Sequence, residues 1–151
     1  MQPIASYNYG AKKNDRIKEV IKLALIYTTA IGTMATFIGI FFPKATIQLF
    51  TSNNEILTEA TLVFRLQLVF FWTMGLQTVT ATLYQALGQA LPALLISVFK
   101  QLFILIPLVY LLPRFTSLNL NGVWYSFPAA ELLAFIITSL ILWKKWRCLK
   151  A

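Results

Sequence analysis

Histidine is absent from this sequence of 151 residues, and cysteine occurs once, at Cys148. A single thiol cannot form an internal disulfide, and zinc or iron sites of the usual kinds need several His or Cys ligands. The sequence also has no glycine-rich phosphate-binding loop and no convergent pair of carboxylates among its five acidic residues. The usual catalytic constellations therefore cannot be assembled, and we expect neither an enzyme nor a bound cofactor or metal.

Charge of either sign is also scarce. Charged residues make up 12% of the chain, whereas 58% is hydrophobic and the mean hydropathy is +0.71. A soluble domain of this size would show amphipathic periodicity throughout. Instead, four apolar runs are long enough to cross a bilayer, at residues 21–42, 62–87, 92–112 and 123–143. We therefore expect an all-α membrane protein with four transmembrane helices, whose immediate surroundings are the lipid bilayer.

Most charges gather at the two ends of the chain, and they give a net charge of +8. With an even number of spans, both basic ends lie on one side of the membrane, and the positive-inside rule makes that side cytoplasmic. Because orientation accounts for these charges, we expect no nucleic-acid partner. The basic residues of the two ends are Lys12, Lys13, Arg16, Lys18, Lys22, Lys144, Lys145, Arg147 and Lys150.

The second apolar run carries a polar stripe. Thr73, Gln77, Thr80 and Tyr84 recur at steps of three and four, so they share one side of a helix. Hydrocarbon cannot satisfy their hydroxyl and amide groups, so this side should face other helices or water. We expect one uninterrupted helix through residues 62–88, with a flank that contributes to a pathway.

Two charged side chains fall inside the later runs. Lys100 lies about two helical turns into the third run, ~12 Å deep by helical rise. Glu131 lies near the middle of the fourth run, where an unpaired carboxylate is costly. Consecutive spans are antiparallel, so one interpretation is an ion pair, or a carboxylate bonded to hydroxyls such as those of Ser126 and Thr138. The other is a titratable group that faces a substrate cavity.

Small residues and proline add expectations for packing and shape. The first run contains Gly32 and Gly39 among four threonines, a pattern that favours close helix packing. Pro107 removes a backbone donor inside the third run and should kink that helix.

Residues 2–16, QPIASYNYGAKKNDR, resemble the end of the eighth helix in the MATE family of multidrug and toxic-compound extrusion transporters. There, a Gln-Pro segment ends in Asn-x-Gly-Ala and leads into a basic cytoplasmic loop. The sequence of this segment is most similar to the MepA-like bacterial branch of the family. Further matches follow in the family's order and spacing: YQALG at 84–88, Lys100 with Gln101, Ile106 with Pro107, and NGVW at 121–124.

The resemblance implies that residues 1–151 are one partial C-terminal lobe, formed by the end of helix eight and helices nine to twelve. We expect a truncated chain whose partner, the N-terminal lobe, is missing. The implied function is secondary active multidrug efflux, exchanging H⁺ or Na⁺ for small cationic drugs across the bacterial inner membrane. The coupling ion would bind mainly in the missing part. Some members place an aspartate in the tenth helix, and Gly75 occupies that position here.

Candidate pathway residues share a polar or aromatic side chain within a span or at its inner end. They are Gln2, Asn8, Phe71, Thr73, Gln77, Thr80, Tyr84, Lys100, Gln101 and Glu131. Two alternatives stay open at this point. One is a lipid-linked oligosaccharide flippase of the same superfamily, which needs a strongly cationic cavity. The other is a small four-helix membrane module that does not transport.

Overall fold

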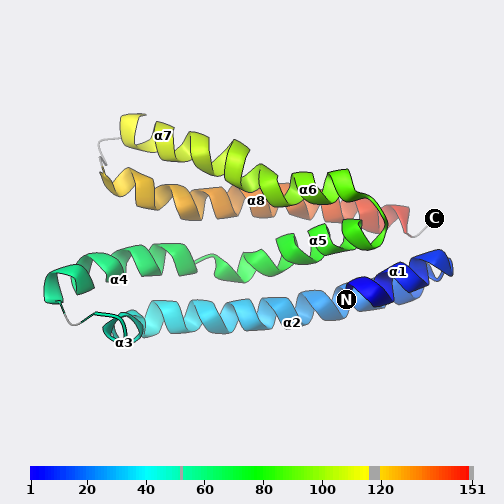
Figure 1. The fold of residues 1–151 in the computed structure, drawn as a ribbon, viewed down its shortest axis with the longest axis horizontal. Helices are drawn as coiled ribbons and strands as arrows, with labels where there is room; N and C mark the ends of the chain where they lie inside the picture. Colours follow the sequence, from blue (N-terminus) through cyan, green and yellow to red (C-terminus); the bar gives the residue numbers. More distant parts are fainter. Residues whose placement is uncertain (52, 116–119, 150–151) are drawn as a thin grey trace.

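The computed structural model describes residues 1–51, 53–115 and 120–149. Four rods run antiparallel along the long axis: α2, the α4–α5 pair, the α6–α7 pair and α8 (Figure 1). The elements in chain order are α1 (Gln2–Gly10), α2 (Asn14–Phe41), α3 (Pro43–Gln48), α4 (Asn54–Leu68), the 3₁₀ turn η1 (Phe71–Thr73), α5 (Met74–Ala86), α6 (Ala90–Phe99), the π-helical segment η2 (Lys100–Leu105), α7 (Ile106–Phe115) and α8 (Leu120–Cys148).

Four helical rods of the described residues are long and apolar enough to cross a membrane. They are Asn14–Phe41, Ile56–Ala86, Ala90–Arg114 and Asn121–Cys148. Only 6% of the third rod's most apolar stretch is buried, and 33% of the fourth's. A helix that is apolar all round yet mostly uncovered needs a nonaqueous surrounding. The prediction of an all-α membrane protein with four spans is confirmed.

The second rod is not one uninterrupted helix, so that expectation is wrong. Helix α4 ends at Leu68, and α5 begins at Met74 after the 3₁₀ turn η1. The irregular turn lies against α2, where a Cβ added to Gly32 would come within 2.8 Å of the Trp72 Cα. Because Gly32 has no side chain, the backbone of the turn can approach α2 this closely.

Close packing of α2 on the second rod is confirmed at two further positions. A Cβ at Gly39 would collide with the Leu68 side chain. The Thr36 hydroxyl donates a hydrogen bond to the Leu68 carbonyl oxygen at 2.9 Å. This carbonyl is the last of α4, so a threonine of the neighbouring helix satisfies an acceptor that the break leaves without its helical donor.

The third rod changes its winding in the middle of the membrane-length stretch. Between α6 and α7, residues Lys100–Leu105 form a π-helical segment. Pro107 follows within one turn and has no N–H for the carbonyl of Phe103, its usual acceptor four residues earlier. A wider turn is one of the ways in which a helix accommodates such a proline. The sequence predicted a disturbance here but not its form.

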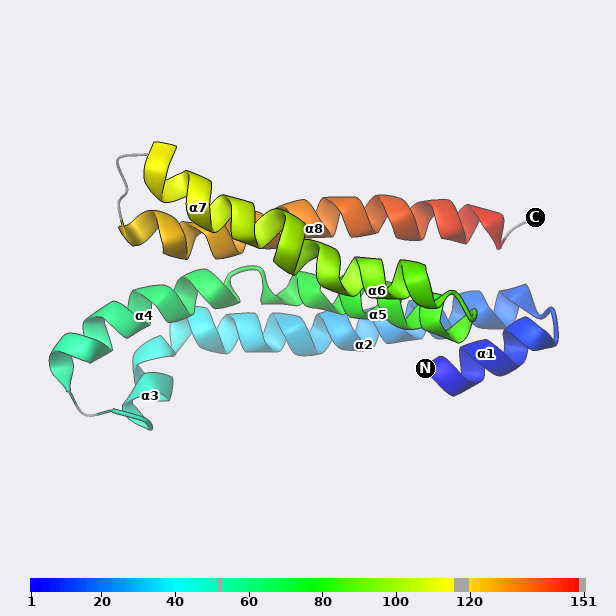
Figure 2. The same cartoon turned by 45° about the horizontal axis from the view of Figure 1, so that its top comes forward.

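Both termini of the described chain come to the same end of the bundle. Ile17 and Ile21 of α2 pack with Leu83 of α5 and with Leu142 and Leu149 at the end of α8. Helix α1 runs beside the start of α2, and Figure 2 shows it at this end with the last turns of α8. The two basic clusters therefore share one end of the molecule.

Candidate functional site

Three polar side chains from three different rods meet inside the bundle. The Lys100 Nζ donates a hydrogen bond to the Glu131 Oε1 at 2.6 Å, which is also an ion pair. The Gln77 Nε2 donates to the other carboxylate oxygen, Oε2, at 2.8 Å. We name Gln77, Lys100 and Glu131 the carboxylate cluster. The predicted ion pair between Lys100 and Glu131 is confirmed, and the amide of Gln77, from the polar stripe, is a further partner.

The cluster is largely withdrawn from solvent. The Lys100 side chain is 19% exposed and the Glu131 side chain 16%. Removing a charge from water is costly unless it is paired and hydrogen-bonded, and here both carboxylate oxygens accept a bond. Ser126 is not a partner, because its hydroxyl donates to the Gly122 carbonyl within α8 at 2.8 Å.

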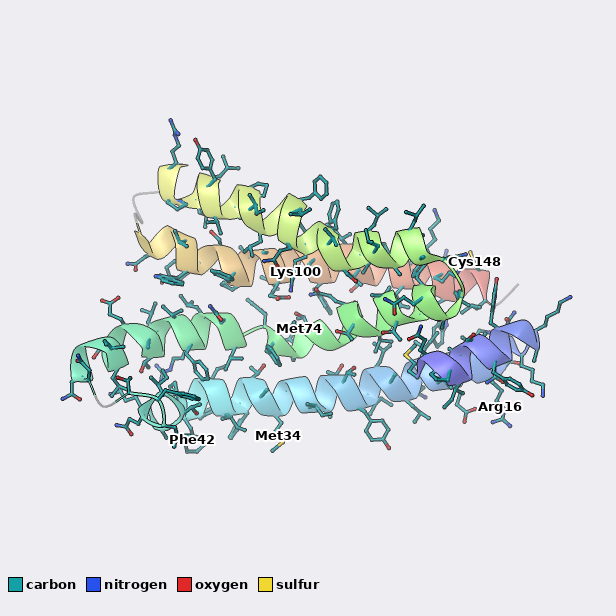
Figure 3. The ribbon with its side chains drawn as sticks, viewed as in Figure 1. Arg16, Met34, Phe42, Met74, Lys100 and Cys148 are labelled. Carbon is teal, nitrogen blue, oxygen red and sulfur yellow. The ribbon has the colours of Figure 1, made fainter. Side chains whose placement is uncertain are left out.

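Local irregularities place the members of this cluster. Lys100 is the first residue of the π-helical segment, and Figure 3 shows it where the third rod lies over α8. Gln77 stands one turn into α5, directly after the break at η1. Segments of π-helix occur frequently at functional sites. The two departures from regular helix therefore flank the one carboxylate at the centre of α8.

A cavity of about 230 Å³ lies beside the cluster, between α6 and α8. Lys100, Thr138 and Tyr84 line it together with apolar side chains such as Phe99. The Lys145 ammonium lies 5.3 Å from the Tyr84 ring centroid and donates to the Gln89 Oε1 at 3.2 Å. The cavity is thus mainly apolar. One cation, Lys100, lies on its wall, and a second, Lys145, contacts the ring of the lining residue Tyr84.

Two threonines of the predicted stripe lie outside the cluster. Thr73 and Thr80 are fully buried, and their hydroxyls donate to carbonyls of their own helical segment, Phe70 O and Leu76 O, each at 2.7 Å. Phe71 is half-buried, and its carbonyl oxygen lies 3.2 Å from where a Gly32 Cβ would stand. In this structure the two threonines are buried inside the bundle, and Phe71 and Thr73 belong to the turn that packs on α2.

The remaining sequence candidates lie away from the cluster as well. Gln2, at the start of α1, and Gln101, in the π-helical segment, are exposed. The Asn8 Nδ2 donates to the Ile4 carbonyl at 2.8 Å within α1. Helical spacing put Gln77 and Thr80 in one stripe, but only the longer amide side chain reaches the next helix. The sequence carried no signal for the π-helical segment beyond Pro107.

Gly75, the position matched to an aspartate in some MATE proteins, has no room for a side chain. A Cβ there would lie 2.7 Å from the Thr28 Oγ1 and 2.9 Å from its Cβ. Among the described residues, no group of three His, Cys, Asp or Glu side chains is placed to hold a metal ion. The carboxylate that this chain offers in its membrane interior is Glu131.

Sequence comparison assigns the chain to a family. A family profile, MatE, matches residues 1–111. The chain belongs to the MATE family. Among its relatives, Probable multidrug resistance protein YoeA of Bacillus subtilis (strain 168) is 28% identical over 137 residues, covering 88% of this chain and 29% of YoeA. Uncharacterized transporter YisQ of the same organism is 23% identical over 138 residues, covering 91% and 30%.

Solved structures agree with this assignment. The MATE multidrug transporter DinF-BH is 35% identical and superposes with a TM-score of 0.86 over 95% of this chain and 32% of its own. An inward-facing MATE transporter of the MOP superfamily shares the fold at a TM-score of 0.90 and 20% identity, over 99% and 34%. This MATE chain is a multi-pass membrane protein that spans about a third of these proteins' length.

Proposed function

We propose that this chain forms one wall of the pathway of a secondary active multidrug transporter. The transporter exchanges H⁺ or Na⁺ for cationic amphiphilic drugs across the bacterial inner membrane by alternating access. The chain acts together with an N-terminal lobe, which supplies the opposite wall and most of the coupling-ion site. MATE proteins are transporters, and the names of the relatives YoeA and DinF-BH refer to multidrug resistance and multidrug transport.

The carboxylate cluster is the observation that carries the proposal. Ionisable side chains inside a membrane are expensive, and they mark ion and substrate pathways. The Glu131 carboxylate forms an ion pair with the Lys100 ammonium. A proton, a sodium ion or an organic cation carries the same charge and can take the place of the ammonium. Each of these would free Lys100 and leave the Gln77 amide as the fixed partner. The exchange of one cation for another at Glu131 is the elementary step that an antiporter needs.

The cluster also weighs against the flippase alternative. A flippase for an anionic, lipid-linked substrate needs uncompensated positive charge in its cavity. Lys100 is the interior cation on which that alternative depended, and its charge is neutralised by Glu131 at 2.6 Å. The cavity beside it is lined mainly by apolar side chains. Both features suit a cationic amphiphile better than a lipid-linked oligosaccharide.

The experiment is a chimera that supplies the opposite wall. The part of YoeA that precedes its matched segment is joined to residues 1–151, and efflux of ethidium, a fluorescent organic cation, is followed in cells that lack other drug exporters. We expect active efflux from the parent chimera. Glu131→Gln keeps the size of the side chain and removes its charge, so we expect it to lose most of the efflux while membrane insertion is unchanged.

Thr33→Ala is the matched control, because Thr33 is exposed on α2 and its hydroxyl bonds only the Thr29 carbonyl of its own helix. This variant should transport like the parent. Efflux by the Glu131→Gln chimera at the parent rate would remove the carboxylate cluster from the mechanism. An inserted parent chimera that never exports ethidium would contradict the proposed function itself.

A further inference from the structure

The end of the bundle that holds both termini is strongly basic. Figure 3 shows Arg16, near the start of α2, and Cys148, near the end of α8, at this same end. The described residues here include eight cations and two carboxylates. The cations are Lys12, Lys13, Arg16, Lys18, Lys22, Lys144, Lys145 and Arg147. Lys150, also part of this cluster in the sequence, lies outside the described residues.

A hollow of about 440 Å³ opens within this basic end. Its wall is formed by the turn from α1 into α2, with Lys12, Lys13 and Lys18, and by Leu149 after the end of α8. Arg16 and one carboxylate, Asp15, also line it. The hollow is therefore lined mainly by cationic side chains, with a single carboxylate among them.

Much of this charge has no counter-ion in the protein. Arg16 pairs with Glu19 at 3.0 Å, and Lys18 pairs with Asp15 at 3.3 Å. Lys12 and Lys13 have no ion-pair partner anywhere in the described part of the chain. Lys13 is also the N-cap of α2, and no side chain caps that helix start. Two ammonium groups without an ion-pair partner therefore line the hollow at a helix start that no side chain caps.

We infer that this hollow binds the phosphate group of an anionic phospholipid in the adjoining membrane leaflet. Uncapped helix amides and lysine ammonium groups are the usual protein ligands of phosphate. Basic pockets at the cytoplasmic ends of membrane helices bind anionic lipid headgroups. The inference concerns binding at the end of the bundle and does not depend on transport at the carboxylate cluster.

The surroundings of the hollow favour a lipid over free phosphate. Helix α1 leads into it and exposes Ile4, Tyr7 and Tyr9, at 55%, 76% and 44%. Tyrosines of this kind concentrate at membrane interfaces, where the ring is apolar and the hydroxyl is hydrated. Acyl chains can lie along this exposed surface of α1, which leads into the turn that lines the hollow, whereas a free ion would not use it.

The test measures lipid retention and thermal unfolding of the 151-residue chain in a nonionic detergent. Phosphatidylglycerol, phosphatidylcholine with the same acyl chains, and inorganic phosphate are added separately. We expect phosphatidylglycerol to raise the unfolding midpoint by several degrees and to remain bound in native mass spectrometry. Equal stabilisation by phosphatidylcholine, or by inorganic phosphate, would overturn the inference.

Two variants locate the site. Lys12 has a positive φ of 55°, which Asn tolerates, so Lys12→Asn with Lys13→Gln removes both free charges without a backbone penalty. At about 1 kcal/mol for each lysine, phosphatidylglycerol should bind roughly 30-fold more weakly. Asp15→Asn removes the carboxylate and should tighten binding. The matched control, Lys44→Gln with Arg114→Gln at the opposite end, should bind like the parent, and equal weakening in it would overturn the assignment of the site.

Discussion

Glu131 depends on residues that are distant in sequence but adjacent in the fold. Its two oxygens accept from Gln77, 54 residues earlier, and from Lys100, 31 residues earlier. The depth of Lys100 and Glu131 in their apolar runs was enough to expect an encounter between them. The part played by Gln77 was not foreseeable in the same way, because helical spacing alone could not separate it from Thr73 and Thr80.

The first prediction concerns the ion pair. Glu131→Leu leaves the Lys100 ammonium buried without a counter-ion, so it should lower the free energy of unfolding by roughly 3 kcal/mol. Lys100→Met should cost a similar amount by stranding the carboxylate. The double variant removes both charges and should unfold near the parent, since an apolar pair of similar volume is often as stable.

Thermal unfolding of the four proteins in one detergent measures this coupling as a double-mutant cycle. Additive losses in the double variant would show that the two side chains do not interact. Such a result would contradict the geometry of the carboxylate cluster.

Among the elements, regular helix was predictable and its interruptions were not. Apolar runs of span length specify the rods, because their composition alone requires a bilayer. The break between α4 and α5 lies against Gly32 on another helix, a contact that no local pattern in residues 62–88 reveals. Pro107 was the only sign of the π-helical segment in the sequence. A helix can accommodate the missing N–H of a proline by a kink or by a wider turn, so the sequence did not decide between them.

The second prediction tests that contact between elements. Gly32→Leu forces a side chain into the backbone of Trp72, where the Cβ alone would stand 2.8 Å from the Cα. Backbone cannot swing aside as a flexible side chain does, so we expect a loss of about 2–3 kcal/mol of stability, typical of overpacking. The measurement is the unfolding midpoint in detergent.

Gly10→Ala is the control for this substitution. An added Cβ at Gly10 meets nothing within 4 Å, and Gly10 ends the helix α1. We expect the stability of this variant to equal or slightly exceed that of the parent. If Gly32→Leu were equally harmless, η1 would not pack on α2 as described.

At the scale of the whole molecule, this chain spans about a third of the length of the MATE proteins that it matches. It covers 29% of YoeA and 34% of the inward-facing structure. Alternating access requires two walls that move against each other around the substrate. The surface of the α6–α7 rod is apolar and mostly uncovered, so either lipid or further helices of a transporter can pack against it.

The third prediction follows from the share of the relatives' length that this chain covers, about a third. Cells that express only these 151 residues should show no rise in resistance to cationic drugs, because a single wall cannot alternate. Minimum inhibitory concentrations against an empty-vector control measure this, with immunodetection in the membrane fraction to show that the chain is present. A reproducible fourfold increase would mean that the chain assembles a pathway by itself.

The measurement that most directly tests the account uses Cys148, the sole cysteine and an exposed one. Four spans with a cytoplasmic basic end predict that a membrane-impermeant maleimide leaves Cys148 unlabelled in intact cells and labels it after permeabilisation. With Cys148→Ser in the background, Ser6→Cys in α1 should behave in the same way, and Lys44→Cys in α3 should be labelled from outside. Labelling of Cys148 but not of Ser6→Cys in intact cells would place the two ends on opposite faces and contradict the account.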